Sequence, residues 1–268
     1  MLDFVLNFLF PPVCGICGKL DENWICEKCK KRIEKYEKFK LIQGKEEINQ
    51  LFNFRNIDLV LNSLENKISN NDEIHKLIYF DEFLYCFEYK GLIRNLILKY
   101  KFSDCGYLSN LFANVILNNK KINEIFESYD IMIPVPMDKM KKQIRGYNQT
   151  ELITKVIEKS INLKEKNSKK IFCETEKSNY KNTNSKIIIN NKCLIKIKNT
   201  KTQSTLSADE RTENIKNAFL VDNKLEIKNK KIILFDDIAT TGSTINEISK
   251  ILKEAGVKKI LVLVIAKD

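Results

Sequence analysis

The feature that most constrains this chain is a short apolar run that passes directly into two aspartates, a turn of small and hydroxyl residues, and a helix. Residues 232–244 read IILFDDIATTGST. Four consecutive apolar residues predict a strand that is buried on both faces of a sheet. The segment 243–255 has a helical pattern, and Gly256 follows it as a stop signal. Ligands of open α/β sheets bind beyond the carboxyl ends of such strands, so this turn is a candidate ligand site.

The residues of this unit suit a ligand that carries both a sugar and a phosphate. Asp236 and Asp237 can accept hydrogen bonds from vicinal sugar hydroxyls. The hydroxyls of the turn can donate to phosphate oxygens, its glycine allows close approach, and the start of the helix favours an anion. We therefore expect a phosphomonoester at the turn and a sugar with vicinal hydroxyls beside the acids. The turn consists of Ala239, Thr240, Thr241, Gly242, Ser243 and Thr244.

Two other phosphate-binding motifs do not fit this segment. No lysine follows the glycine as in a Walker loop, and there is no G-x-G-x-x-G fingerprint. A plainer interpretation is a strand–turn–helix in which Ser243 caps the helix and the acids are simply exposed. Because a cap needs one hydroxyl and this turn offers several after paired acids, the sequence favours a ligand site.

The rest of the chain alternates strands with helices. This alternation predicts an α/β fold with a mostly parallel sheet and helices on both of its faces. The predicted strands are residues 83–89, 129–135, 231–235 and 259–265, and the predicted helices are about 92–100, 108–117, 148–160 and 243–255.

Composition divides the chain into three parts. Residues 1–35 form a small cysteine-rich module, residues 36–80 a weakly patterned connecting segment, and residues 81–268 the α/β domain. Inside that domain, the Lys- and Asn-rich stretch 161–200 is predicted to be an extended, partly β insertion with a solvated surface. Two strands, 186–189 and 194–197, are expected within it. A helix over 207–217, with Ser207 as its N-cap, is expected to follow.

Four of the eight cysteines are close together in the sequence. Cys14, Cys17, Cys26 and Cys29 give the spacing C-x2-C-x8-C-x2-C. Two such pairs can complete a tetrahedral zinc site, and because all four positions are filled the zinc would be structural. A fold this small has little core, so the metal would supply its folding energy. Four unrelated buried thiols are the alternative interpretation, and an iron–sulfur cluster fits less well.

The net charge of +11 comes from 46 Lys and Arg against 35 Asp and Glu. A basic surface attracts phosphates, whether on nucleic acid or on a small anion, although the abundance of Lys, Asn and Ile also fits an AT-rich genome. No apolar stretch approaches the roughly 20 residues that span a bilayer. The run 1–10 contains Asp3 and lacks a basic start, which favours an amphipathic helix over a signal peptide. A reducing, cytoplasmic location is expected.

Several further motifs, taken in order, give a family resemblance. Residues 89–102 contain YKGLIR and LKYKF, residues 133–136 read IPVP, residues 145–149 read RGYNQ, and residues 202–214 contain TQSTLS and ERTEN. The strand–turn–helix unit resembles the signature of type I phosphoribosyltransferases. With the cysteine module, the whole order resembles the ComF family, also called the ComFC or GntX-like group.

This resemblance implies roles for particular residues. Asp236 and Asp237 would bind the ribose hydroxyls of phosphoribosyl pyrophosphate, and residues 239–244 its 5-phosphate. The pyrophosphate would lie near Pro134, Val135 and Pro136, with Lys101, Arg145 and Arg211 as candidates to neutralise it. Arg211 falls in a segment that resembles a mobile hood. Lys101 and Arg145 could also be ordinary surface charges.

The resemblance leaves two hypotheses of function. In the first, the protein is a phosphoribosyltransferase: a nucleophile displaces pyrophosphate at the anomeric carbon, and Mg²⁺ is bound mainly through ligand oxygens. The single histidine, His75, lies in the weakly patterned segment, so a histidine-based triad is not expected. In the second, the protein is a non-catalytic accessory of DNA uptake in natural transformation that docks a competence helicase or single-stranded DNA. A zinc-ribbon transcription factor is a weaker third hypothesis.

Overall fold

A computed structural model describes residues 13–21, 25–52, 78–172, 187–198 and 214–268. Its centre is a six-stranded sheet of order β1-β2-β8-β7-β3-β4. Only β1 runs antiparallel to its neighbour, while the other pairs are parallel. The mostly parallel sheet predicted from the sequence is therefore confirmed. The strands are β1 (Glu37–Ile42), β2 (Glu82–Glu88), β3 (Ile131–Pro134), β4 (Ile188–Ile189), β7 (Lys231–Ala239) and β8 (Lys259–Lys267).

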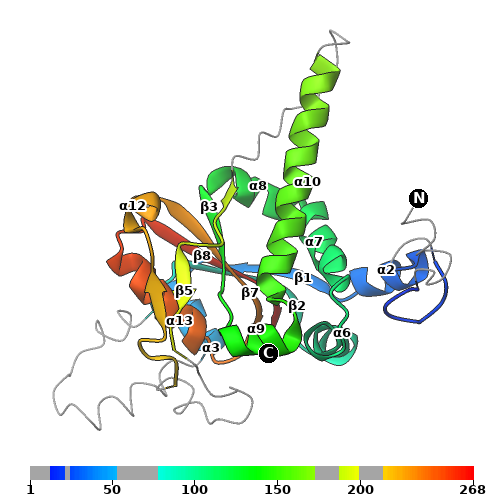
Figure 1. Ribbon diagram of the computed structural model, residues 1–268, viewed down its shortest axis with the longest axis horizontal. Coiled ribbons are helices and arrows are strands. Elements are labelled where there is room, and N and C mark those ends of the chain that lie inside the picture. Colours follow the sequence, from blue (N-terminus) through cyan, green and yellow to red (C-terminus); the bar gives the residue numbers. More distant parts are fainter. Residues whose placement is uncertain (1–12, 22–24, 53–77, 173–186, 199–213) are drawn as a thin grey trace.

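Helices cover both faces of the sheet, as Figure 1 shows. One face packs against α6 (Gly91–Phe102), α7 (Leu108–Asn118), α8 (Lys120–Ser128) and α10 (Gln149–Phe172). The other face packs against α3 (Lys45–Phe52), α13 (Ser243–Glu254) and the hairpin of β5 (Leu194–Lys196) and β6 (Phe219–Val221). Side chains of β7 alternate between them: Ile233 and Phe235 belong to the first core, and Ile232 and Leu234 to the second. This explains why the strand is apolar throughout.

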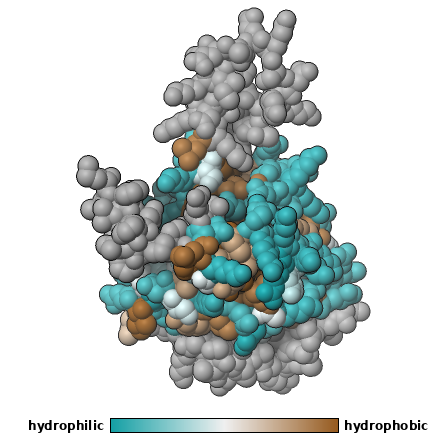
Figure 2. Space-filling model, turned by 90° about the vertical axis from the view of Figure 1, so that its right-hand side faces the viewer, coloured by the Kyte–Doolittle hydropathy of each residue, from teal (hydrophilic) through white to brown (hydrophobic). Residues whose placement is uncertain are grey.

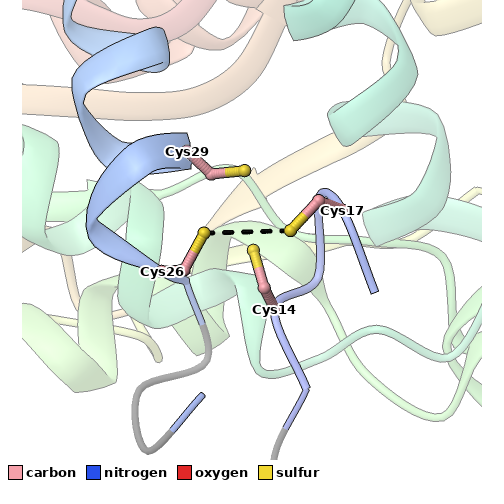
Figure 3. A group of neighbouring side chains, drawn as sticks. All are labelled: Cys14, Cys17, Cys26 and Cys29. Atoms are coloured by element: carbon pink, nitrogen blue, oxygen red, sulfur yellow. Dashed lines mark hydrogen bonds between the residues drawn. The ribbon is translucent and has the colours of Figure 1, made fainter. Parts of the chain in front are cut away.

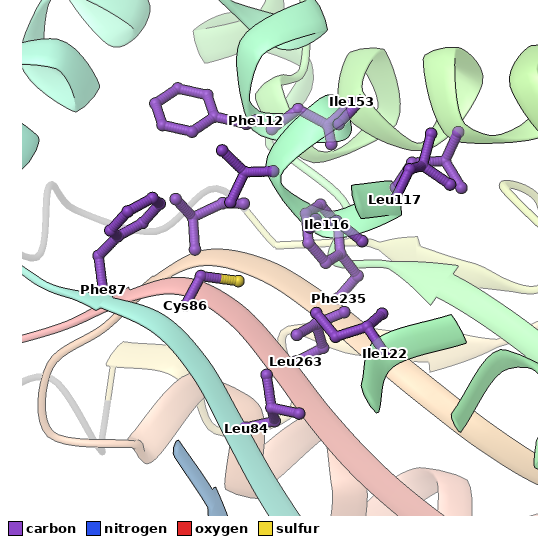
Figure 4. Close-up of a cluster of buried hydrophobic side chains, with 14 of the residues drawn as sticks. Leu84, Cys86, Phe87, Phe112, Ile116, Leu117, Ile122, Ile153, Phe235 and Leu263 are labelled. Atoms are coloured by element: carbon purple, nitrogen blue, oxygen red, sulfur yellow. The ribbon is translucent and has the colours of Figure 1, made fainter. Parts of the chain in front are cut away.

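The first core gives a direct test of the packing (Figure 4). Phe112 of α7 is 1% exposed, and its ring lies 5.6 Å from that of Tyr100. We expect Phe112→Ala to lower the free energy of unfolding by about 3–5 kcal/mol, because it leaves a cavity among residues that cannot close over it. Urea denaturation measures this. Leu225→Ala, at a side chain that is 83% exposed, is the control and is expected to change stability by less than about 0.5 kcal/mol. A similar effect for both variants would contradict the packing described.

The predicted end of one helix was wrong. The sequence analysis ended it at residue 160 and treated 161–200 as extended, whereas α10 continues to Phe172. Ile153, Ile157 and Ile161 are all buried and recur every four residues, so the helix keeps a packed stripe beyond the predicted end. No proline or glycine follows to stop it.

The rest of the insertion agrees better with the prediction. Strand β4 adds to the edge of the main sheet beside β3, and β5 pairs with β6. Both lie at the predicted positions, although residue 186 falls outside the described residues. Of the helix predicted over 207–217, residues 207–213 also lie outside them, and only Asn214 and Ile215 are seen as helical.

The segment predicted as a connector contributes to the sheet. Strand β1, from residues 37–42, pairs with β2, and α3 packs Ile48 and Phe52 into the second core. The division of the chain at residues 35 and 80 stays a prediction.

The surface seen in Figure 2 is largely hydrophilic, with hydrophobic side chains scattered toward its middle. Among the helices of the described residues, none combines the length and the apolar character that a membrane span requires.

Candidate functional site

A cleft of about 680 Å³ opens at the carboxyl ends of β3 and β7. The two strands are adjacent in the sheet, so the residues that follow them meet at one edge. The cleft is lined from β7 and its turn by Asp236, Asp237, Ile238, Thr240 and Thr244, from the segment after β3 by Val135, Pro136, Met137 and Asp138, and from helices and the hairpin by Arg94, Lys101, Lys141, Arg145, Asn148, Gln149, Thr150 and Lys196, among others.

A second hollow, of about 730 Å³, lies between α7 and α2 (Glu27–Glu34). Its charged lining consists of Glu27, Glu34, Glu37 and Lys30, with several asparagines. Three carboxylates against one ammonium disfavour a phosphate, so the cleft at β3 and β7 is the better candidate for the predicted ligand.

The two aspartates lie inside strand β7 and not after it. The strand was predicted to end at residue 235, but it pairs with β8 as far as Ala239, because β8 extends to Lys267 and provides the partner. The backbone N–H of Asp237 donates to Asp236 Oδ1 at 2.8 Å. Lys101 of α6 pairs with Asp237, Nζ to Oδ1 at 2.9 Å, and both side chains are less than a fifth exposed.

Burial and the neighbouring Asp237 raise the pKa of Asp236 to about 7, although Lys101 and Lys196 oppose the shift. The carboxyl group therefore changes its charge near neutral pH. A carboxyl with a strongly shifted pKa in a cleft is typical of a functional site.

The turn after β7 begins helix α13. Gly242 has φ 77°, in the left-handed region that favours glycine, and it is the N-cap residue. The N-cap position is held by Gly242, so the alternative interpretation of Ser243 as the cap is wrong. Ser243 and Thr241 are instead within 2.9 Å of each other, Oγ to Oγ1. Thr240 and Thr244 line the cleft, whereas Ala239 is buried.

The opposite wall is held together by hydrogen bonds to one carbonyl. Val135 O accepts from Asn148 Nδ2 at 3.2 Å and from Thr150 Oγ1 at 2.8 Å. The Val135 N–H in turn donates to Phe235 O at 2.9 Å. The predicted segment 134–136 is thereby fixed between β7 and the start of α10.

Arg145, the last residue of α9 (Lys139–Arg145), lies on this wall. It donates from Nη1 to Gln149 Oε1 at 2.7 Å and lies over the ring of Phe102, 5.0 Å from the centroid. Burial lowers its pKa, and Asp237 opposes the shift. Both Arg145 and Lys101 thus line the cleft. Arg211 lies outside the described residues.

Sequence reasoning missed several residues of the cleft. Lys196 of β5 lines it, and burial together with Lys141 lowers the pKa of Lys196 to about 8, against Asp138 and Asp236. Alternation along residues 194–197 would have buried Ile195 and Ile197 and exposed Lys196, but in the structure both isoleucines are exposed. In the sequence, Gln149 could be recognised only as part of the RGYNQ motif, and Thr150 only as part of the start of a predicted helix.

The four clustered cysteines form a candidate metal centre (Figure 3). Cys14 and Cys17 come from a turn and Cys26 and Cys29 from the start of α2, with all four Sγ atoms within 4.8 Å of one another. The Cys17 and Cys26 sulfurs are 3.8 Å apart. Tetrahedral zinc with Zn–S bonds of about 2.3 Å requires sulfurs about 3.8 Å apart, so the set fits zinc.

The four-cysteine module also packs against the α/β domain. Gly18 has φ 71° in the turn between Cys14 and Lys19, as expected for a tight turn. A Cβ on Gly15 would lie 2.6 Å from the ring of Tyr107, so glycine there allows the module to approach the start of α7. Ile33 of α2 is 2% exposed in the first core.

Comparison with known proteins decides the family. The profile of the phosphoribosyl transferase domain matches residues 135–268, which is half of the chain and includes most of the residues that line the cleft. The chain belongs to the phosphoribosyl transferase family. The match begins at Val135 and contains the two aspartates, the turn and Arg145.

Curated relatives confirm the resemblance to the ComF group. The chain is 30% identical over 176 residues to competence protein F of Haemophilus influenzae, which covers 64% of this chain and 66% of that protein. It is 26% identical over 175 residues to competence protein ComFC of Streptococcus pneumoniae, which covers 65% of this chain and 63% of that one. The DNA utilization protein YhgH of Escherichia coli K12 is 25% identical over 173 residues, 63% of this chain and 64% of its own length. The alignments thus span just under two thirds of these relatives.

Proposed function

We propose that this phosphoribosyl transferase family member binds phosphoribosyl pyrophosphate in the cleft and transfers its phosphoribosyl group to an acceptor. The observation that carries the proposal is the meeting of paired carboxylates, a glycine-capped helix start and a guanidinium in one cleft. These three groups match a ribose diol, a phosphomonoester and a diphosphate. The family match over residues 135–268 supports this pairing of groups with ligand parts.

Each part of the ligand would bind to groups that the fold already holds in place. The 5-phosphate would lie at the turn 239–244, where hydroxyls and backbone N–H groups surround the start of α13. The ribose hydroxyls would donate to Asp236 and Asp237. Because Lys101 already pairs with Asp237, a bound ribose would have to share that carboxylate, which leaves the ammonium beside the diphosphate.

The chemistry would need no side-chain nucleophile. A lone pair of the acceptor forms a bond to the anomeric carbon as the bond to the diphosphate oxygen breaks, and pyrophosphate leaves with that electron pair. Arg145, Lys101 and the segment 134–136 would stabilise the departing charge. Mg²⁺ would supply further neutralisation of the diphosphate through ligand oxygens and water, and the carboxylates at the cleft are oxygen donors that suit it. A cytoplasmic location is part of this proposal.

The activity is tested by incubating the protein with phosphoribosyl pyrophosphate, Mg²⁺ and a panel of nucleobases and amines. Pyrophosphate release that requires one acceptor would identify the reaction. Release with no member of the panel, in a protein that still binds the substrate, would favour the accessory function below.

A second candidate function follows from the names of the relatives. Competence protein F and DNA utilization protein YhgH point to DNA uptake, and the net charge of +11 suits a polyanion. Here the protein would be a non-catalytic accessory that docks a competence helicase or single-stranded DNA. Binding of single-stranded DNA that weakens steeply with salt supports this candidate.

The raised pKa of Asp236 gives a prediction about pH. Below about pH 7 the carboxyl is largely protonated, so it is a weaker acceptor for the ribose hydroxyls. We expect the affinity for phosphoribosyl pyrophosphate to rise about tenfold between pH 6 and pH 8. Part of that rise in affinity comes from ionisation of the ligand's own phosphate groups. Asp236→Asn lacks the titrating carboxyl, so its affinity changes with pH only through the ligand. Equal pH profiles for the wild type and the variant would contradict the assignment.

A further inference from the structure

Gln149 carries a buried amide that the fold leaves unsatisfied. It is the first residue of α10, it is 1% exposed, and it lines the cleft. Among the described residues, its Nε2 is one of two buried side-chain polar atoms without a hydrogen-bond partner. An unpaired buried donor is costly, and in native proteins such a group often marks the place of a missing acceptor.

The direction of this amide is fixed by its neighbours. Oε1 accepts a hydrogen bond from Arg145 Nη1 at 2.7 Å. Arginine has donors only, so turning the amide over would set its NH₂ group against the guanidinium. The backbone oxygen of Gln149 also accepts from Tyr100 Oη at 2.9 Å, which holds the residue in place. Nε2 is therefore the atom that faces away from Arg145 and lacks an acceptor.

The amide lies beside the Arg145 guanidinium at the start of helix α10. Gly146, with φ 83°, ends α9 and turns the chain so that Arg145 lies beside the start of α10. Asn148 Oδ1 accepts from the Thr150 N–H at 3.2 Å, so residue 148 caps that helix and its dipole favours an anion there. This α9–α10 junction, residues 145–150, is bonded to Val135 O on the wall opposite the turn of α13.

We propose that the α9–α10 junction is an oxyanion subsite for the diphosphate of the ligand. Gln149 Nε2 donates to a diphosphate oxygen, and Gln149 Oε1 holds the Arg145 guanidinium for the same group. This inference rests on the proposed function and adds to it the residue that distinguishes a sugar bearing a diphosphate at C1 from one that does not. The carboxylates of β7 and the turn 239–244 hold the parts that both ligands share.

The test compares three ligands, each with Mg²⁺: phosphoribosyl pyrophosphate, ribose 5-phosphate and inorganic pyrophosphate. Gln149→Glu keeps an acceptor for Arg145 but replaces the donor with a charge that repels the diphosphate. We expect the two diphosphates to bind about 10–100-fold more weakly and ribose 5-phosphate to change by less than about twofold, measured by equilibrium dialysis. Gln149→Met, of similar size and without charge, is expected to show the same selective loss at about tenfold.

Gln143→Glu is the matched control, because Gln143 is exposed on α9, the helix that ends at Arg145, and the charge change is equal. It is expected to leave all three affinities within about twofold. Equal losses for ribose 5-phosphate and the diphosphates in the Gln149 variants would show a packing role and overturn the inference, as would unchanged pyrophosphate binding. If the wild type bound neither sugar phosphate, the proposed function itself would fail.

Discussion

Replacing Asp236 and Asp237 together with asparagine is expected to lower the affinity for phosphoribosyl pyrophosphate by at least about 100-fold. Hydrogen bonds to a charged acceptor contribute about 1.5–3 kcal/mol each, and two are removed. The variant also leaves Lys101 without the carboxylate that it contacts at 2.9 Å. Isothermal titration calorimetry measures the effect. Asp222→Asn, at an exposed acid outside the cleft, is the control. A loss below about threefold would exclude the acids from the ligand site.

The raised pKa of Asp236 also leads to a prediction about stability. The folded pKa of Asp236, about 7, is higher than the value of about 4 expected when unfolded, so the folded state holds its proton more tightly. Stability contributed by this group is therefore lost as the pH rises from about 4 to 7. At pH 8 we expect Asp236→Asn to unfold with a free energy about 1–2 kcal/mol higher than the wild type, after allowance for solvent in the cleft. Lower stability of the variant at that pH would contradict the burial described.

Removing the metal from the four-cysteine centre is expected to unfold residues 13–21 and 25–35 and leave the α/β domain folded. Zinc supplies about 10–16 kcal/mol of apparent binding free energy to small modules of this type, which exceeds what a few buried side chains provide. Backbone hydrogen bonds from Cys17, Cys26 and Ile16 outweigh burial and lower the pKa of Cys14 to about 6, which favours a thiolate ligand. The chain should hold one zinc ion, seen by elemental analysis.

Hydrogen exchange tests the consequence. After chelation, or in Cys29→Ser, the module should lose its protection while the strands β7 and β8 keep theirs. Cys105→Ser is the control, because this partly exposed thiol lies outside the cluster. A full complement of zinc in Cys29→Ser, or a chain that holds no metal as purified, would contradict the assignment.

Local patterns were sufficient to predict some of the elements that build the cleft, but not helix α9. The apolar run of β7, the glycine before α13 and the paired cysteines each act through neighbours in sequence, so their structure could be expected. The length of α10 could not, since its last turns are set by packing of Ile161 into a core formed by distant segments. Strand β7 passed its predicted end because β8 runs beside it as far as Lys267.

Some residues of the cleft could likewise be predicted from the sequence, and others could not. Asp236, Asp237 and Thr240 lie on one continuous segment, and all three line the cleft, while their part in ligand binding stays a prediction. Lys196 reaches the cleft because the β5–β6 hairpin packs over the second face of the sheet, which reverses the expected alternation. Gln149 could be recognised as functional only once its unsatisfied amide was seen beside Arg145.

The most direct test of the account is a calorimetric titration of the wild-type protein with phosphoribosyl pyrophosphate and Mg²⁺ at two temperatures. The enthalpy of binding changes with temperature, so a value of zero at one temperature is not zero at the other. We expect saturable binding of one molecule per chain, displaced by ribose 5-phosphate. Absence of heat at both temperatures, with zinc bound and the fold intact, would contradict the claim that this cleft holds a ribose and its terminal phosphate.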